Sequence, residues 1–388
     1  MRPLLSVCRM IGVILLMFSM AGCQPVAPTL TSKEQVFMNN YTSEMVPRCF
    51  GRYLIDLPAD MKPGRLSGAT FAIFPYTEYS GGIRVKVISM SKEQFDIQLA
   101  KREDELKAKH IDAEPQQPYL DNTISLDDRT GIIFNRSENG GSRGARTLEL
   151  HGWKDGYAIK MTIDAADVSY PEYQEDKQLQ DLGSNVQPKL AMLQSLYART
   201  SGRTNDEIPS GPGTCIQNGF ISGPASDKMS ESISMNFVSR SMPDVIFHLA
   251  TDNVHTKTTL LDRMPDIRHA LDVVHGHVIR DRSSVTKSGQ SYEEVLTTKQ
   301  MDDNNPLMGQ SFKLEANSKM GKAHNPLINV SFDNGKREAP PGHDESDLLS
   351  GGKLPYPPKL EKASLSEAES VALWDAVTKT LRPRPRAF

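Results

Sequence analysis

Apolar and polar residues alternate in short stretches that recur in two parts of the chain. Between residues 83 and 87, apolar side chains occupy every second position and basic side chains lie between them. This is the period of a half-buried strand. The same kind of pattern predicts further strands over 69–74 in the first part and over 232–237 and 245–250 in the second.

A helical pattern follows each pair of strands. In the first part, Ser91 and Gln94 have the spacing of an N-terminal capping box. In the second part, the pattern predicts a helix that begins near Lys257 and is kinked at Pro265. The apolar faces of the two predicted helices are formed by Phe95, Leu99 and Leu106, and by Leu260, Met264, Ile267, Leu271 and Val274.

More strands and a closing helix complete each part. The predicted strands are 131–135, 147–152 and 157–163 in the first part, and 278–282, 292–298, 311–316 and 328–332 in the second. The first closing helix has Leu190, Leu193, Leu196 and Tyr197 on one side. The second has Ser366 and Glu369 as a capping box before its apolar face.

This order of elements indicates one unit used twice. Cys49 and Cys215 begin the two copies, 166 residues apart, and an isoleucine and a proline follow each cysteine at the same offsets. The predicted fold is α+β: two similar, duplicated domains, each a largely antiparallel sheet with packed helices. We place the domains at 46–199 and 215–388, with a linker at 200–214. The second copy alone has a long Pro- and Gly-rich loop, 336–358, and such loops are often functional or disordered.

The N-terminus has the pattern of an export signal. The first nine residues form a short basic segment with Arg2 and Arg9. An apolar run over 10–20 follows, which is too short to span a bilayer as a helix. The run ends in small residues before Cys23, as in a bacterial lipobox. We therefore predict a signal peptide at 1–22, lipidation of Cys23 and a polar tether at 23–45. The alternative is an ordinary secretory signal with a chance cysteine.

Composition narrows the class of partner. Removing residues 1–22 takes away two arginines and no acid, so 43 basic and 48 acidic side chains remain and the net charge becomes −5. This mild, interspersed charge predicts no nucleic-acid partner.

Gln24, which follows the lipidated cysteine, favours the outer membrane, on the periplasmic face.

Two cysteines remain in the mature body. Cys8 leaves with the signal and Cys23 is lipidated, so Cys49 and Cys215 are left. An oxidising periplasm favours a disulfide between them. Two separate buried thiols remain the alternative, because sequence does not give the distance between their Cα atoms.

Motifs that carry chemistry are absent from the sequence. No G-x-S-x-G sequence lies on a predicted strand-to-helix turn, where a nucleophile elbow would stand, and there is no phosphate-binding loop and no HExxH. His269, His275 and His277 form the densest histidine cluster, but a helix C-terminus explains them as well as a metal does. We predict no catalytic residue, no cofactor and no metal. Trp153 is more often a packing residue than a partner contact, yet it remains a candidate contact.

Three segments resemble one known family. They are the stretch 47–58 after a lipoprotein signal, the repeat that starts at Cys215, and the ending 364–385 with its Arg-Pro-Arg-Pro run. They resemble the periplasmic lipoprotein immunity proteins that neutralise phospholipase effectors of the type VI secretion system, in the fourth lipase effector class.

The resemblance implies a non-enzymatic inhibitor. Its partner would be a cognate secreted phospholipase, gripped between the two domains so that the lid of the lipase stays closed, and its lipid would hold it at a membrane. Within the loop 336–358 we single out four candidate contacts, His343, Leu348, Leu349 and Tyr356. One alternative is a non-enzymatic envelope lipoprotein with another partner. A hydrolase with an unfamiliar site is a second alternative, and it would need convergent acid, base and nucleophile groups.

Overall fold

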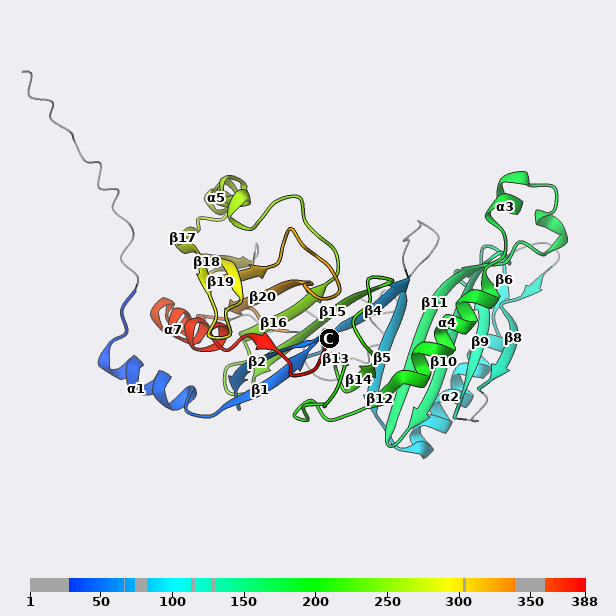
Figure 1. Ribbon diagram of the computed structural model, residues 1–388, viewed down its shortest axis with the longest axis horizontal. Helices are drawn as coiled ribbons and strands as arrows, with labels where there is room; N and C mark the ends of the chain where they lie inside the picture. Colours follow the sequence, from blue (N-terminus) through cyan, green and yellow to red (C-terminus); the bar gives the residue numbers. More distant parts are fainter. Residues whose placement is uncertain are drawn as a thin grey trace, which may run out of the picture.

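The computed structural model describes residues 28–65, 67–73, 82–112, 116–126, 130–302, 305–338 and 360–388. Its main feature is one 13-stranded sheet that runs through the whole molecule (Figure 1). The strands supplied by the N-terminal part are β3 (Met61–Pro63), β4 (Gly68–Ile73), β5 (Ile83–Ser89), β8 (Leu120–Ser125), β9 (Gly131–Ser137), β10 (Ala145–Lys154) and β11 (Tyr157–Ala166). Those of the C-terminal part are β15 (Met229–Ser239), β16 (Val245–Asp252), β17 (His277–Val285), β18 (Ser291–Asp302), β19 (Asn305–Ala316) and β20 (Leu327–Asn334).

The two parts contribute strands in the same spatial order. The N-terminal unit has the order β4-β5-β11-β10-β9-β8, and the C-terminal unit has β15-β16-β20-β19-β18-β17. Their equivalent first strands, β4 and β15, pair with each other antiparallel, so the sheet continues from one unit into the other. All described pairings within these units are antiparallel too. The predicted fold class, α+β with two similar units of antiparallel sheet and packed helices, is confirmed.

Helices cover both faces of the sheet. We call the face that carries α4 (Val186–Arg199) and α7 (Glu367–Thr378) the inner face; there Leu148, Ile163, Phe312 and Trp374 belong to one apolar core that spans both units. The opposite, outer face carries α2 (Lys92–Lys107) in the N-terminal unit and η2 (Leu261–Arg263) with α5 (Met264–Val273) in the C-terminal unit. The predicted capping boxes at Ser91 and Ser366 are both present at the starts of α2 and α7.

The helix predicted from Lys257 with a kink at Pro265 is different in the structure. The α-helix α5 begins at Met264, and Pro265 lies in its first turn. Proline is tolerated there because the N–H groups of the first turn have no partner within the helix. The prediction of a kink was therefore wrong: Pro265 helps to begin the helix, and the preceding residues form only the short 3-10 turn η2.

The segment predicted as a tether contains an ordered helix. Residues Ser32–Tyr41 form α1, which begins with a capping box between Thr31 and Glu34 and lies against α7 (Figure 1). The hydroxyl of Ser366 donates a hydrogen bond of 2.6 Å to the Glu34 carboxylate. Little in the residue pattern indicates this helix, because only Met38 on it is buried.

The segment 200–214, predicted as a linker, is part of the fold. It begins in β12 (Thr200–Gly202) and ends in β13 (Gly213–Ile216), and both pair with β14 (Gly219–Ser222) in a small sheet. A second small sheet consists of β1 (Met45–Phe50), β2 (Tyr53–Pro58) and the C-terminal β21 (Arg382–Pro383). The remaining elements are the ribbon β6 (His110–Ile111) with β7 (Gln117–Pro118), the turn η1 (Pro171–Tyr173) and α3 (Lys177–Leu182). None of the described helices is long and apolar enough to cross a membrane.

Candidate functional site

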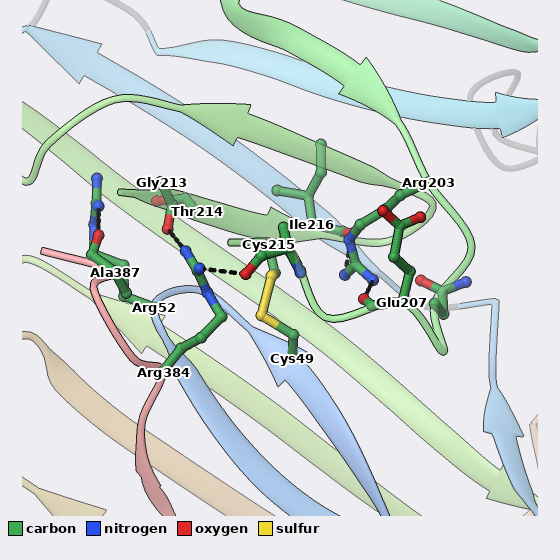
Figure 2. The surroundings of a disulfide bond; sticks show 12 residues. Cys49, Arg52, Arg203, Glu207, Gly213, Thr214, Cys215, Ile216, Arg384 and Ala387 are labelled. Carbon is green, nitrogen blue, oxygen red and sulfur yellow. Dashed lines mark hydrogen bonds between the residues drawn. A yellow bond between two sulfur atoms is a disulfide. The ribbon is translucent and has the colours of Figure 1, made fainter. Parts of the chain in front are cut away.

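A disulfide joins the two units at equivalent positions. Cys49 in the β1–β2 hairpin is bonded to Cys215 in the β13–β14 hairpin, with 5.8 Å between their Cα atoms (Figure 2). Both cysteines are buried, and backbone hydrogen bonds between Gly51 and Cys215 lie beside the bond. Because the two cysteines begin the two copies of the unit, the disulfide lies where equivalent parts of the duplicated fold meet.

A buried ion pair next to the disulfide also connects the units. Arg52, which follows Cys49, binds both carboxylate oxygens of Glu231 on β15, at 2.7 and 3.2 Å. The same guanidinium donates to the carbonyl oxygens of Gly223 and Ala387. Thr214 donates to Glu231 as well, at 2.5 Å. Since Arg52 is 4% exposed, breaking this pair would leave a charge buried without its partner.

Two further arginines bind backbone carbonyls instead of carboxylates. Arg384, from the C-terminal tail, donates to the carbonyls of Pro209, Gly211 and Gly213 at 2.6–2.8 Å. Figure 2 shows Arg384 and Gly213 near the disulfide. Arg203 donates to the carbonyls of residues 204, 207, 216 and 219. Burial lowers the pKa of Arg384, and it lowers that of Arg203 to about 10, so both remain cations at neutral pH. These bonds order the segment that sequence reasoning treated as a linker.

The segments that carried the family resemblance therefore meet at this junction. The stretch 47–58 forms β1 and β2, the repeat at Cys215 forms β13 and β14, and the Arg-Pro-Arg-Pro ending adds β21 beside β2. Most of these positions are buried or engaged in bonds within the chain. The junction holds the two units together and offers little surface to a partner.

The outer face of the sheet is partly exposed. Strands β4, β5 and β15 and the ends of β11 and β16 lie between α2 on one side and α5 on the other (Figure 1). Lys86, Lys160 and His151 form a row across β5, β11 and β10 on this face. Next to this row, Arg84 binds Asp164 through both carboxylate oxygens at 3.2 Å, with both side chains substantially exposed.

Beneath α2 the outer face contains a buried carboxylate. Glu149 on β10 is fully buried and binds Arg102 of α2 at 2.9 Å and Arg136 of β9 at 2.7 Å. His151 at 2.7 Å and Lys160 at 3.4 Å complete its surroundings. Burial opposes ionisation, but the hydrogen bonds from His151 and Arg102 and the charge of Lys160 hold the pKa of Glu149 well below its usual value. This cluster attaches α2 to the sheet and closes this part of the face.

Trp153 lies at the end of the same strand. Its indole N–H donates a hydrogen bond of 2.9 Å to the carbonyl of Met90, and its side chain is half-buried. On the outer face Trp153 lies beside Ala158, which lies beside Ile88 on β5. Ile88 is 37% exposed, so an apolar edge remains accessible there. The structure thus gives Trp153 a packing role and places it next to an exposed apolar residue; its role as a partner contact stays a prediction.

A polar hollow of about 320 Å³ lies on the outer face of the C-terminal unit. Strands β16, β18, β19 and β20 supply its floor and walls, and the residue pair His248 and Asp333 lies inside it with 3.6 Å between the ring nitrogen and the carboxylate. Three lysines surround it: Lys299, Lys313 and Lys336. Sequence reasoning missed this site. Some of its polar members, such as His248 and Lys313, stand within predicted strands, and others, such as Lys299, lie just beyond the predicted ends; only the strand order brings them together.

Other predicted site residues lie elsewhere. Cys23, His343, Leu348, Leu349 and Tyr356 fall outside the residues that the structure describes. The nearest described part of the predicted contact loop is its start, at Lys336 on the rim of the hollow.

The histidines near the end of α5 have separate surroundings. His277 lies 3.2 Å from Glu367, and His275 has a left-handed backbone that ends the turn after the helix. In the described ranges, no group of three or more His, Cys, Asp or Glu side chains is arranged to hold a metal ion.

Comparisons with known proteins agree with this two-unit architecture. A solved Tle4–Tli4 complex contains a chain that is similar with a TM-score of 0.63 at 18% identity, over 89% of this chain and 99% of that one. The apo structure of the immunity protein TplEi of the type VI secretion system from Pseudomonas aeruginosa is similar with a TM-score of 0.61 at 17% identity, over 88% and 98% of the two chains. The structure of TplEi complexed with an "L" peptide is similar with a TM-score of 0.56 at 18% identity, over 89% of this chain and 99% of that one. No curated protein matches the chain.

Two family models match the sequence itself, one for each unit. The model of the Tle cognate immunity protein 4 N-terminal domain matches residues 46–203, and that of the C-terminal domain matches residues 207–386. Only residues 204–206 lie between the two matches, which follow each other in the order expected of one intact protein. The chain therefore belongs to the Tle cognate immunity protein 4 family.

Proposed function

We propose that this chain is an immunity protein that binds a type VI secretion phospholipase effector in the periplasm and inhibits it without catalysing a reaction. The observation that carries the proposal is the match of both immunity-protein domain models, in order, to the two units of the structure. The similar chain in the Tle4–Tli4 complex supports a partner of the Tle4 kind.

The proposed mode of inhibition is steric. The two units would hold the effector between them and keep the lid of the lipase from opening. A rigid connection between the units supports this mode, because an inhibitor that loses little conformational freedom on binding retains more of its interaction energy. The Cys49–Cys215 disulfide, the Arg52–Glu231 pair and the continuous β4–β15 pairing supply such a connection.

The proposed location is the periplasmic face of the outer membrane. The lipobox at Cys23 and the following Gln24 support lipid anchoring there. A chain tethered to the membrane that the lipase attacks would be present at a high effective concentration. Mass spectrometry of the N-terminal peptide tests this part: acylated Cys23 is expected, and an unmodified N-terminus created by cleavage elsewhere would contradict it.

Co-expression tests the function. A Tle4-type lipase encoded in the same genome is sent to the periplasm of a sensitive host together with the full chain. Growth and a complex that survives purification are expected. The matched control lacks residues 1–22, so the same body stays in the cytoplasm and gives no protection. Continued killing despite correct export would refute immunity against that lipase and favour a binding role for another envelope partner.

A further inference from the structure

We infer that the polar hollow on the outer face of the C-terminal unit is a socket for an acidic segment of the effector, in which a carboxylate enters between Lys299, Lys313 and Lys336. This inference rests on the proposed function and names the chemistry of one contact. The hollow is lined by residues of strands β16, β18, β19 and β20 and by Lys336, which lies two positions after the end of β20.

The charge around the hollow is the first argument. Three ammonium groups line it, and Asp333 is the one carboxylate among its described lining residues, although the whole chain carries a net charge of −3. Lys313 is partly neutralised, because its ammonium group lies 2.9 Å from the buried Glu315. Among the described residues, Lys299 and Lys336 make no ion pair within 4.0 Å. Within the described residues, neither cation has a carboxylate at salt-bridge distance, so both would attract an anionic group.

The hydrogen-bonding groups are the second argument. Asp333 lies on the floor, with 15% of its side chain exposed and its carboxylate 3.6 Å from the ring nitrogen of His248. Although burial raises the pKa of Asp333, the neighbouring His248, Ser311 and Lys336 hold it below its usual value, so it stays an acceptor at neutral pH. A peptide segment brings both a carboxylate for the lysines and backbone N–H donors for Asp333. A phosphate group brings only acceptors and would be repelled by this carboxylate, so the hollow suits a protein partner better than a lipid headgroup.

The shape of the floor is the third argument. Gly309 and Gly335 have no side chains, and Met301 lies over both of them; a Cβ built on Gly309 would come within 2.6 Å of Met301 Cγ. Because neither glycine has a side chain, Met301 packs directly against the backbone there and forms part of the lining. The hollow, of about 320 Å³, has room for a side chain from a partner surface.

The position of the hollow allows one partner to contact both units. The same outer face continues through β15 and β4 to the basic residues Arg84 and Lys86 of the N-terminal unit. No helix of the described chain crosses β15 or β4 on this side. A partner that lies across the central strands would therefore reach the hollow and the N-terminal unit together.

Charge reversal of the two unpaired lysines tests the inference. The full chain, purified in detergent from a host that exports it, is compared with the double variant Lys299→Glu/Lys336→Glu in binding to the Tle4-type lipase of the same genome. The matched control, Lys177→Glu/Lys257→Glu, makes the same charge change at exposed positions away from the hollow. We expect the first variant to bind about 100-fold more weakly, about tenfold for each reversed charge, and the control to change less than threefold. The loss is expected to shrink at about 0.5 M salt, where charges are screened within a few Å.

Further measurements separate the outcomes. The neutral variant Lys299→Gln/Lys336→Gln is expected to lose about tenfold, and circular dichroism checks that each variant is folded. A lipase variant with one acidic residue changed to lysine is expected to restore binding to the charge-reversed chain. If the wild-type chain binds and both double variants bind equally well, the socket is wrong and the proposed function stands. If the wild-type chain does not bind the lipase at all, both fail. Charge-dependent binding to phosphatidylglycerol vesicles, with unchanged lipase binding, would assign the hollow to lipid phosphate and overturn the inference.

Discussion

Replacing Glu149 with glutamine tests how α2 is attached to the sheet. The buried carboxylate binds Arg102 of α2 through both oxygens at 2.9 Å and Arg136 at 2.7 Å, with Lys160 at 3.4 Å. Glutamine has nearly the same shape but no charge, so these cations would lose their common counter-ion. Removing one partner of a buried ion pair costs about 3–5 kcal/mol. Because the side chains of Arg102 and Lys160 are 25% and 33% exposed, water compensates in part, and we expect about 3 kcal/mol.

Asp164→Asn is the matched control on the same face of the sheet. Asp164 also binds an arginine through both oxygens, but the side chains of Arg84 and Asp164 are 56% and 34% exposed. An exposed pair contributes about 0–1 kcal/mol, so this variant is expected to lose less than 1 kcal/mol. Urea unfolding followed by circular dichroism measures both free energies. Hydrogen exchange along α2 (Lys92–Lys107) shows whether the loss is local, and we expect faster exchange there in Glu149→Gln alone.

The effect of Glu149→Gln should depend on pH. The pKa of Glu149 is lowered in the folded chain from its usual value of 4.5. A carboxyl with a lowered pKa contributes its stability above the unfolded value and loses it as pH falls, by about 1.4 kcal/mol for each pH unit below that value. The difference between wild type and variant should therefore be constant at pH 6–7 and smaller by about 2 kcal/mol at pH 3. Equal losses in Glu149→Gln and Asp164→Asn, or a difference that does not change with pH, would refute the reasoning.

Three further changes test other parts of the fold. Changing Cys49 and Cys215 to alanine opens a 166-residue loop, which costs about 5 kcal/mol on chain entropy; chemical denaturation of the oxidised proteins measures it, and a loss under 1 kcal/mol would contradict this account. Ser366→Ala removes a capping box and should cost about 1 kcal/mol, seen as a lower melting temperature with faster exchange at the start of α7; an unchanged helix start would show that the cap is dispensable. Gly152→Ala places a Cβ 2.3 Å from the Tyr197 hydroxyl and should cost about 1–3 kcal/mol, again by denaturation; wild-type stability would mean that α4 shifts freely.

Local patterns predicted the individual strands well. The alternation at 83–87 lies within β5, and the predicted strands 147–152 and 157–163 lie within β10 and β11, which are joined by a turn with Asp155 and Gly156 at positive φ. These features depend on neighbouring residues alone, which is why sequence shows them. The helix α1 was missed for the converse reason: it buries a single residue, Met38, and its stability comes from contacts with a segment more than 300 positions away.

Long-range assembly could not be predicted in the same way. The pairing of β4 with β15 joins residues about 160 positions apart, and nothing local in either strand specifies that partner or its register. The hollow depends on the same step. Some of its polar residues stand within predicted strands and others just beyond their predicted ends, but Lys299 and His248 line the same hollow only through the order β16-β20-β19-β18.

The duplicated units have diverged on one face only. On the inner face both units pack a closing helix, α4 or α7, against equivalent strands, and at the junction equivalent cysteines are joined. On the outer face the N-terminal unit is covered by α2 through the buried Glu149, whereas the shorter α5 lies toward β17 and, within the described residues, leaves the hollow on β16, β19 and β20 uncovered. Substitutions in the core or junction would destabilise both units at once, because the sheet and apolar core are continuous. Substitutions of the lysines around the hollow change charges that are at least partly exposed. Divergence in effector specificity is therefore expected to concentrate at the open outer face, while the buried arginines and the disulfide keep the two units in place.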